Sequence, residues 1–167
     1  PLSEETGARC IACDASVPED VDHLFEELDR NDRSPALVIY NASFRTRGRF
    51  TGLDRDLVRK TLDITAYGAF LVAQAAAKRM LDRGDGAIFF TGASASVKGY
   101  PQSAPFAMGK FALRGLTQSL ARELSPQNIH VAHFVIDGGI GDESNPRSAE
   151  RGSDGLLHPD AIAETYM

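Results

Sequence analysis

Three residues that could take part in proton transfer lie in and just after a loop at positions 91–105. Ser94 and Tyr100 carry hydroxyl groups and Lys110 carries an ammonium group, so each can donate a proton to a reacting oxygen. Phe106 precedes Lys110 by four residues, a spacing that places both side chains on one face of a helix. The simpler alternative is a solvated helix lysine, an exposed loop tyrosine and a serine that forms a turn.

Cysteine and histidine give little reason to expect a metal. Cys10 and Cys13 form a C-x-x-C motif, but the chain has no second pair to complete a zinc site. Their stretch reads as a strand, on which residues three apart point to opposite faces. The four histidines lack the spacing of metal ligands. We therefore expect no metal site and two reduced cysteines that pack as small apolar side chains.

Length and composition indicate one globular domain. The 167 residues include 43% hydrophobic and 25% charged side chains. A net charge of −5 without a basic stripe argues against nucleic acid and anionic membranes as partners. No apolar run reaches the roughly 18 residues that a membrane span needs. We expect a cytoplasmic protein with a small-molecule substrate.

Apolar periodicity predicts strands that alternate with helices. Strands are expected at residues 9–13, 36–40, 87–90 and 129–136, and helices at residues 17–31, 54–82, 106–124 and from 159 onward. Ser16 is the expected N-cap of the first of these helices. Residues 137–158 have the polar, glycine-rich composition of a mobile loop.

This order of elements predicts an α/β fold, a doubly wound parallel sheet of the Rossmann type with three α/β/α layers. Such sheets bind ligands at the carboxyl ends of their strands. We therefore expect the functional residues in the loops that follow residues 13, 40, 90 and 136.

Those loops resemble the short-chain dehydrogenase/reductase family over nearly the whole chain. Asp14 resembles the family's aspartate that binds adenine, and Tyr40-Asn41-Ala42-Ser43 resembles its N-N-A-G motif. Residues 64–70 resemble the N-x-x-G-x-F helix, and residues 86–91 resemble the strand before the catalytic serine. Further matches are residues 106–110, at the place of the Y-x-x-x-K motif, and residues 128–131, which lead to the place of the P-G motif.

The resemblance also shows which catalytic positions differ. Phe106 stands at the family's proton-donating tyrosine, Ala93 at its serine and Thr65 at its asparagine. The P-G motif reads Asp137-Gly138, and only the lysine remains, as Lys110. Because a phenyl ring has no proton to give, the chemistry is altered or lost.

Other groups offer a relocated proton donor: Tyr100, the loop serines Ser94, Ser96 and Ser103, and Tyr67 on the helix that borders the site. Ser94 directly follows Ala93, and Tyr100 lies ten residues before Lys110. The longer tyrosine–lysine spacing of bacterial enoyl reductases would need a tyrosine at position 103, which is a serine here.

The resemblance implies an NAD(P)-dependent oxidoreductase that acts on a small carbonyl or alcohol substrate. It assigns catalysis to Lys110, Ser94 and Tyr100. It assigns contacts with NAD or NADP to Asp14, Asn41, Ala42, Lys110 and Gly138. It also implies a homodimer or homotetramer formed through the helices around residues 73–77 and 106–124. The alternative is a non-catalytic member that uses the groove for a ligand or the helices for partners.

The family's phosphate loop, G-x-x-x-G-x-G, does not occur in these 167 residues. In the resemblance, residues 9–13 are the third strand, so the first βαβ unit is absent and residues 1–167 form an incomplete single domain. We therefore expect no neighbour for residues 9–13 and a bare apolar edge at residues 36–40. The family's last strand would follow Met167.

Overall fold

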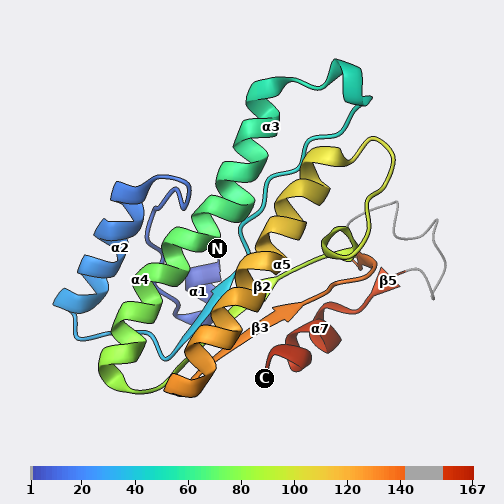
Figure 1. The fold of residues 1–167 in the computed structure, drawn as a ribbon. Helices are drawn as coiled ribbons and strands as arrows, with labels where there is room; N and C mark the ends of the chain where they lie inside the picture. Colours follow the sequence, from blue (N-terminus) through green and yellow to red (C-terminus); the bar gives the residue numbers. More distant parts are fainter. Residues whose placement is uncertain (1, 142–155) are drawn as a thin grey trace.

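The computed structural model of the chain describes residues 2–141 and 156–167. Its centre is a parallel sheet in the order β1 (Leu37–Tyr40), β2 (Gly86–Thr91) and β3 (Ile129–Phe134) (Figure 1). The predicted α/β fold with a parallel sheet is therefore confirmed.

Helices cover both faces of this sheet. α4 (Gly68–Arg83) and α5 (Ala104–Leu124) pack on one face, with α2 (Pro18–Arg30) beside α4 (Figure 1). α7 (Pro159–Tyr166) lies on the other face, where the Tyr166 ring stacks on Phe134 at 3.9 Å between centroids. The three-layer arrangement that the sequence predicts is thus present.

Successive side chains of β2 point alternately to the two faces of the sheet, and so both helical layers contact it. Ile88 and Phe90 are completely buried under the helices, together with Ala69, Ala76 and Leu113. Phe89, between them, points to the opposite face and contacts the rings of Phe134 and Tyr166. Small alanines let α4 lie close to the sheet, so its alanine-rich stretch serves the core of this chain.

The predicted helix at residues 54–82 is confirmed as one continuous helix with a π-helical turn in its middle. α3 (Arg55–Leu62) begins after Asp54, whose carboxylate accepts the N–H groups of Asp56 at 2.8 Å and Leu57 at 3.1 Å. The π turn, η2 (Asp63–Tyr67), joins it to α4, which ends at Gly84 in the left-handed conformation.

Short elements complete the described chain. The strands β4 (Gly139–Ile140) and β5 (Leu156–Leu157) pair in parallel. The short helices are α1 (Leu2–Thr6), η1 (Phe50–Gly52), η3 (Ser94–Ser96) and η4 (Ser125–Gln127).

Two sequence predictions near the start of the chain are wrong. Residues 9–13 form no strand, because no strand of the described chain lies beside them to share backbone hydrogen bonds. Ser16 is not the N-cap of α2: Val17 is, and the Ser16 hydroxyl donates to Asp14 at 2.6 Å instead. Residues 142–155, most of the predicted mobile loop, lie outside the described residues.

The expected bare edge is confirmed at β1. Leu37 and Ile39 are 41% and 46% exposed there, because β1 is paired on one side only within the described residues. None of the helices in residues 2–141 and 156–167 has the length and apolar character that a membrane crossing requires.

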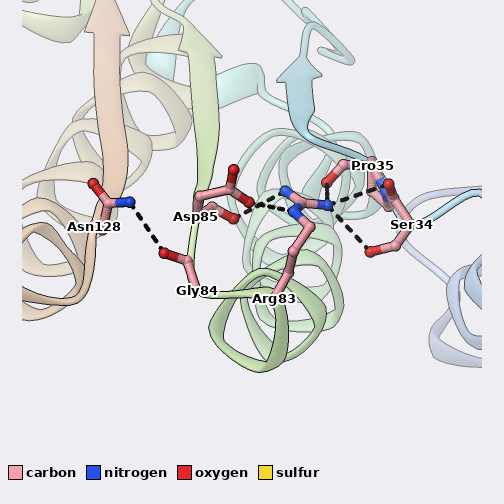
Figure 2. Close-up of polar contacts among 6 residues, drawn as sticks. All are labelled: Ser34, Pro35, Arg83, Gly84, Asp85 and Asn128. Atoms are coloured by element: carbon pink, nitrogen blue, oxygen red, sulfur yellow. Dashed lines mark hydrogen bonds and ion pairs between the residues drawn. The ribbon is translucent and has the colours of Figure 1, made fainter.

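The amino ends of the three strands are tied together by side chains. Arg83, at the end of α4, donates to the carbonyl oxygens of Pro35 at 3.1 Å and Asp85 at 2.9 Å (Figure 2). Asn128, just before β3, donates through its side-chain amide to the Gly84 carbonyl at 3.1 Å (Figure 2). These contacts fix the end of the sheet opposite to the predicted site.

Candidate active site at the carboxyl ends of the strands

A cavity of about 760 Å³ opens where the strands end, a volume typical of small-molecule sites. The loops that follow β1, β2 and β3 all contribute to its wall. It brings together most of the predicted site residues, namely Asn41, Ser94, Tyr100, Lys110 and Gly138. Asp14 and Ala42 do not line this cavity.

Lys110 is the most deeply buried charged group of the cavity wall. Its side chain is 3% exposed, and its ammonium donates to the Thr91 carbonyl at the end of β2, at 2.7 Å. Burial lowers the pKa of Lys110 from 10.5 to about 8. An ammonium with such a pKa can both hold a ligand oxygen and release a proton near neutral pH.

Phe106 lies one helical turn before Lys110, with its ring centroid 5.7 Å from the ammonium nitrogen. The guanidinium carbon of Arg45 lies 4.7 Å from the same centroid. A phenyl ring attracts cations through the negative potential of its face. Phe106 therefore holds positive charge at the position where a tyrosine would offer a hydroxyl group.

Thr65 lies in the π turn and is completely buried. Its hydroxyl accepts the backbone N–H of Phe44 at 3.4 Å, which ties the loop after β1 to this helix. A Cβ added at Gly109 would lie 3.1 Å from the Thr65 Cβ, so a glycine there lets α5 approach closely. The π turn is fixed further because the Tyr40 hydroxyl donates to the Ile64 carbonyl.

Backbone contacts shape the loop after β2. The N–H of Gly92 donates to the Phe134 carbonyl at 2.7 Å, and the N–H of Ser94 donates to the Ile136 carbonyl at 3.1 Å. The Ser96 hydroxyl accepts the N–H of Ala93 at 3.1 Å. Ser94 is therefore held at the cavity wall with its own hydroxyl in no hydrogen bond to any described residue.

Tyr100 lines the outer part of the cavity and is 45% exposed. The Lys98 ammonium lies 5.5 Å from the centroid of its ring. A hydrogen bond with Tyr100 and the nearby charge of Asp137 raise the pKa of Lys98. Tyr100 thus has a cation beside it, as a proton-donating tyrosine needs, but that cation is Lys98.

The carboxylate of Asp14 forms its hydrogen bonds with a residue of its own loop. Its carboxylate accepts the Ser16 hydroxyl at 2.6 Å and the Ser16 N–H at 2.9 Å, and these bonds lower the pKa of Asp14. The assignment of Asp14 and Ala42 to cofactor binding stays a prediction.

Three further polar side chains at the site went unnoticed in the sequence: Arg45 and Arg47, which line the cavity, and His133. Ser103, in the loop that the sequence singled out, also lines the cavity, and its buried hydroxyl has no hydrogen-bond partner in the described chain. His133, behind the cavity wall, has a buried Nε2 that likewise lacks a hydrogen-bond partner in residues 2–141 and 156–167. Burial and the charges of Lys110 and Arg114 lower the pKa of His133. Neither of the two arginines nor His133 belongs to a spaced motif that would reveal it.

The cysteines stand apart from this site. Cys10 and Cys13 are free thiols, and Cys10 is exposed rather than packed as a small apolar side chain. Burial and the charges of Asp20 and Asp14 raise the pKa of Cys13. Nowhere in the part of the chain that the structure describes do three metal-ligating side chains gather.

Solved structures share this architecture. A short-chain dehydrogenase from Rhodopseudomonas palustris aligns with a TM-score of 0.76 and 32% identity, over 98% of this chain and 68% of that one. A 4-hydroxyisoleucine dehydrogenase complexed with NADH and succinate aligns with a TM-score of 0.85 and 25% identity, over 99% and 74%.

Sequence comparison agrees. A 3alpha-hydroxysteroid dehydrogenase of Mediterraneibacter gnavus is 33% identical over 117 residues, which are 70% of this chain and 45% of that protein. The chain spans about half the length of the curated relatives that it matches. Residues 1–143 match the family model described as enoyl-(acyl carrier protein) reductase. With the fold and the order of its loop motifs, this match places the chain in the short-chain dehydrogenase/reductase family of oxidoreductases.

Proposed function

We propose that this protein is an NAD(P)-dependent oxidoreductase that reduces a small carbonyl compound or oxidises the corresponding alcohol. The observation that carries this proposal is the convergence of Asn41, Ser94, Tyr100, Lys110 and Gly138 on one cavity. That cavity lies at the carboxyl ends of parallel strands, where sheets of this type bind ligands. The relative complexed with NADH supports the choice of cofactor.

The residues of the cavity fit the nicotinamide end of NAD or NADP. The buried Lys110 ammonium donates one hydrogen bond to Thr91, which leaves two N–H groups for the hydroxyls of a ribose. The Asn41 amide and the backbone at Gly138 add polar groups at the wall. The bound nicotinamide would supply or accept the hydride.

The chain's own task is then to orient the substrate and give a proton to its oxygen. Phe106 has no proton to give, so the hydroxyls of Ser94 and Tyr100 are the proposed donors. Ser94 lies beside the position of the family's serine, and Tyr100 has the Lys98 ammonium beside its ring. Lys110 holds the cofactor and keeps positive charge next to the developing alkoxide.

Titration of NADH and NADPH into the protein, followed by turnover of a panel of ketones and aldehydes, tests this proposal. We expect binding of one cofactor, slow turnover, and loss of both in Lys110→Ala. Turnover that is lost in Tyr100→Phe and kept in Ser94→Ala would identify Tyr100 as the donor, and the reverse would identify Ser94. Binding and turnover that Lys110→Ala leaves unchanged would contradict the site.

The second candidate is a non-catalytic family member that binds a ligand or a second copy of itself. The observation that favours it, beside Phe106, is an exposed apolar face on the helices around the site. Tyr67 and Phe70, stacked with their centroids 6.2 Å apart, share this exposure with Met108 and Phe111. We propose that this face joins subunits in a homodimer or homotetramer. Cofactor binding without any turnover, in a dimer by sedimentation, would favour this candidate.

A further inference from the structure

The loop after β1 brings two arginines to the cavity. Arg45 and Arg47 both line its wall, two residues apart in the segment 44–48, which we call the arginine loop. Neither side chain forms an ion pair or a hydrogen bond with any residue in the ranges 2–141 and 156–167. Two unpaired guanidinium groups at one cavity wall repel each other, and an anion between them would remove this repulsion.

The arginine loop is held at both ends. The N–H of Phe44 donates to Thr65 at 3.4 Å, and the N–H of Gly48 donates to the Gln102 carbonyl at 3.1 Å. The Phe106 ring contacts the Arg45 guanidinium, 4.7 Å from the ring centroid to the guanidinium carbon. Because the backbone of the loop is fixed at both ends, less ordering of the loop is needed when a ligand binds.

The charges near Arg45 also indicate that the position attracts anions. Partial burial and the nearby charge of Arg47 lower the pKa of Arg45. The cavity wall carries one carboxylate, Asp137, but the charge of Asp137 acts on Lys98, outside the arginine pair. Lys110 adds a third cation on the inner side.

Ser103 supplies an independent observation. Its side chain is 4% exposed and lines the same cavity, yet its hydroxyl has no hydrogen-bond partner among the described residues. Buried hydroxyls are normally satisfied, so an unpartnered one in a cavity wall marks a place for a ligand atom. Ser103 directly follows Gln102, the residue to which the arginine loop is bonded.

We infer, on the basis of the proposed oxidoreductase function, that Arg45, Arg47 and Ser103 bind an anionic oxygen group, a carboxylate or a phosphate ester, on the substrate. The guanidinium groups offer paired N–H donors that match the oxygens of either group, and the Ser103 hydroxyl donates a further hydrogen bond. The substrate carbonyl then lies toward Lys110, Ser94 and Tyr100. Phe106, which has no proton to give, serves in this arrangement as a support for the anion-binding Arg45.

The test compares matched probes in wild type, Arg45→Gln, Arg47→Gln and the control Arg49→Gln, whose arginine directly follows the arginine loop but is outside the cavity wall. The probes are 4-oxopentanoate and its methyl ester, which share one ketone, and hydroxyacetone phosphate and hydroxyacetone. Calorimetry without cofactor measures binding of each probe, and turnover with the preferred cofactor measures KM and kcat.

We expect wild type to bind one charged probe at least tenfold more tightly than its neutral partner. Each cavity arginine variant should lose roughly tenfold to a hundredfold of that affinity, as for removal of a hydrogen bond to a charged group. Ser103→Ala should weaken the same probe by a smaller factor, and Arg49→Gln should leave it unchanged. The charged probe that responds tells a carboxylate site from a phosphate site.

Two results would overturn the inference. One is equal affinity for charged and neutral probes, with no change in the double variant of Arg45 and Arg47. The other is a loss of NADH affinity in the arginine variants that matches the loss for the probe, because the arginines would then hold the cofactor. If no nicotinamide binds but the charge selectivity is present, the proposed oxidoreductase function fails and the anion site stands.

Discussion

The two ends of the sheet use their polar side chains in opposite ways. At the amino ends, the side chains of Arg83 and Asn128 donate hydrogen bonds to backbone carbonyls of the neighbouring turns (Figure 2). At the carboxyl ends, Arg45 and Arg47 form no hydrogen bond or ion pair with any described residue, and the Lys110 ammonium forms one hydrogen bond. Polar groups whose hydrogen bonds are all formed within the protein stabilise the fold, whereas polar groups without such partners at a cavity remain available to a ligand. The comparison locates stability at one end and function at the other.

The largest effect should come from restoring the family's proton donor. Phe106→Tyr combined with Ala93→Ser puts a hydroxyl next to Lys110, whose ammonium already faces the ring at 5.7 Å. General acid catalysis by a positioned group contributes about a hundredfold or more, so ketone turnover should rise by on the order of a hundredfold. Steady-state kinetics with the preferred cofactor measures this rise. If the variant gains nothing, or keeps its gain after Lys110→Ala, the carboxyl end is not organised as proposed.

The buried ammonium of Lys110, at the same end of the sheet, should lower the stability of the folded chain. The pKa of Lys110 falls from its ordinary 10.5 to about 8 in the folded chain, so folding discourages the charged form. The penalty is fully present below pH 8 and is relieved as the pH rises toward 10.5, so stability should increase across that window. Lys110→Met removes the penalty, which is roughly 3 kcal/mol at pH 7.

Urea denaturation at pH 7 and at pH 10 compares Lys110→Met with wild type. The variant should be more stable at pH 7, and the difference should shrink at pH 10. A variant less stable than wild type at both pH values would mean that the ammonium has compensating partners.

At the amino end, Arg83→Ala should have the opposite effect on stability and none on binding. It leaves the carbonyls of Pro35 and Asp85 without this donor, and we expect a loss of roughly 1–2 kcal/mol. Arg122→Ala is the matched control, because among the described residues its guanidinium bonds only a carbonyl of its own helix, that of Gln118. Thermal unfolding checks the stability, and NADH titration checks binding. Weaker NADH binding in Arg83→Ala would contradict the assignment of stability to the amino end and of binding to the carboxyl end.

The smallest effect is expected at Asn128, which combines a positive φ of 62° with its bond to Gly84. Asn128→Gly keeps the backbone conformation and loses only the bond, so it should cost about 0.5–1 kcal/mol. Asn128→Ala should cost more, since alanine tolerates positive φ poorly. Equal losses in a urea series would show that the backbone conformation contributes nothing.

Periodicity and motif order predicted most of this fold, because buried strands and amphipathic helices repeat apolar residues at fixed intervals. They failed at residues 9–13, where composition favours a strand but no neighbouring strand of the described chain supplies hydrogen bonds. Motif spacing also predicted that Lys110 and Ser94 would share a site. It offered Ser103 only as a possible proton donor and was silent on Arg45 and Arg47, since their significance depends on contacts between loops that are distant in sequence.

Hydrogen–deuterium exchange with and without NADH, and again with NADPH, tests the contrast between the two ends most directly. The account predicts that one cofactor slows exchange in residues 41–49, 91–103 and 136–140, which line or adjoin the cavity. Exchange in residues 83–86 and 125–128, at the amino end, should not change. Protection at the amino end alone, or no protection with either cofactor, would contradict the assignment of function to the carboxyl ends of the strands.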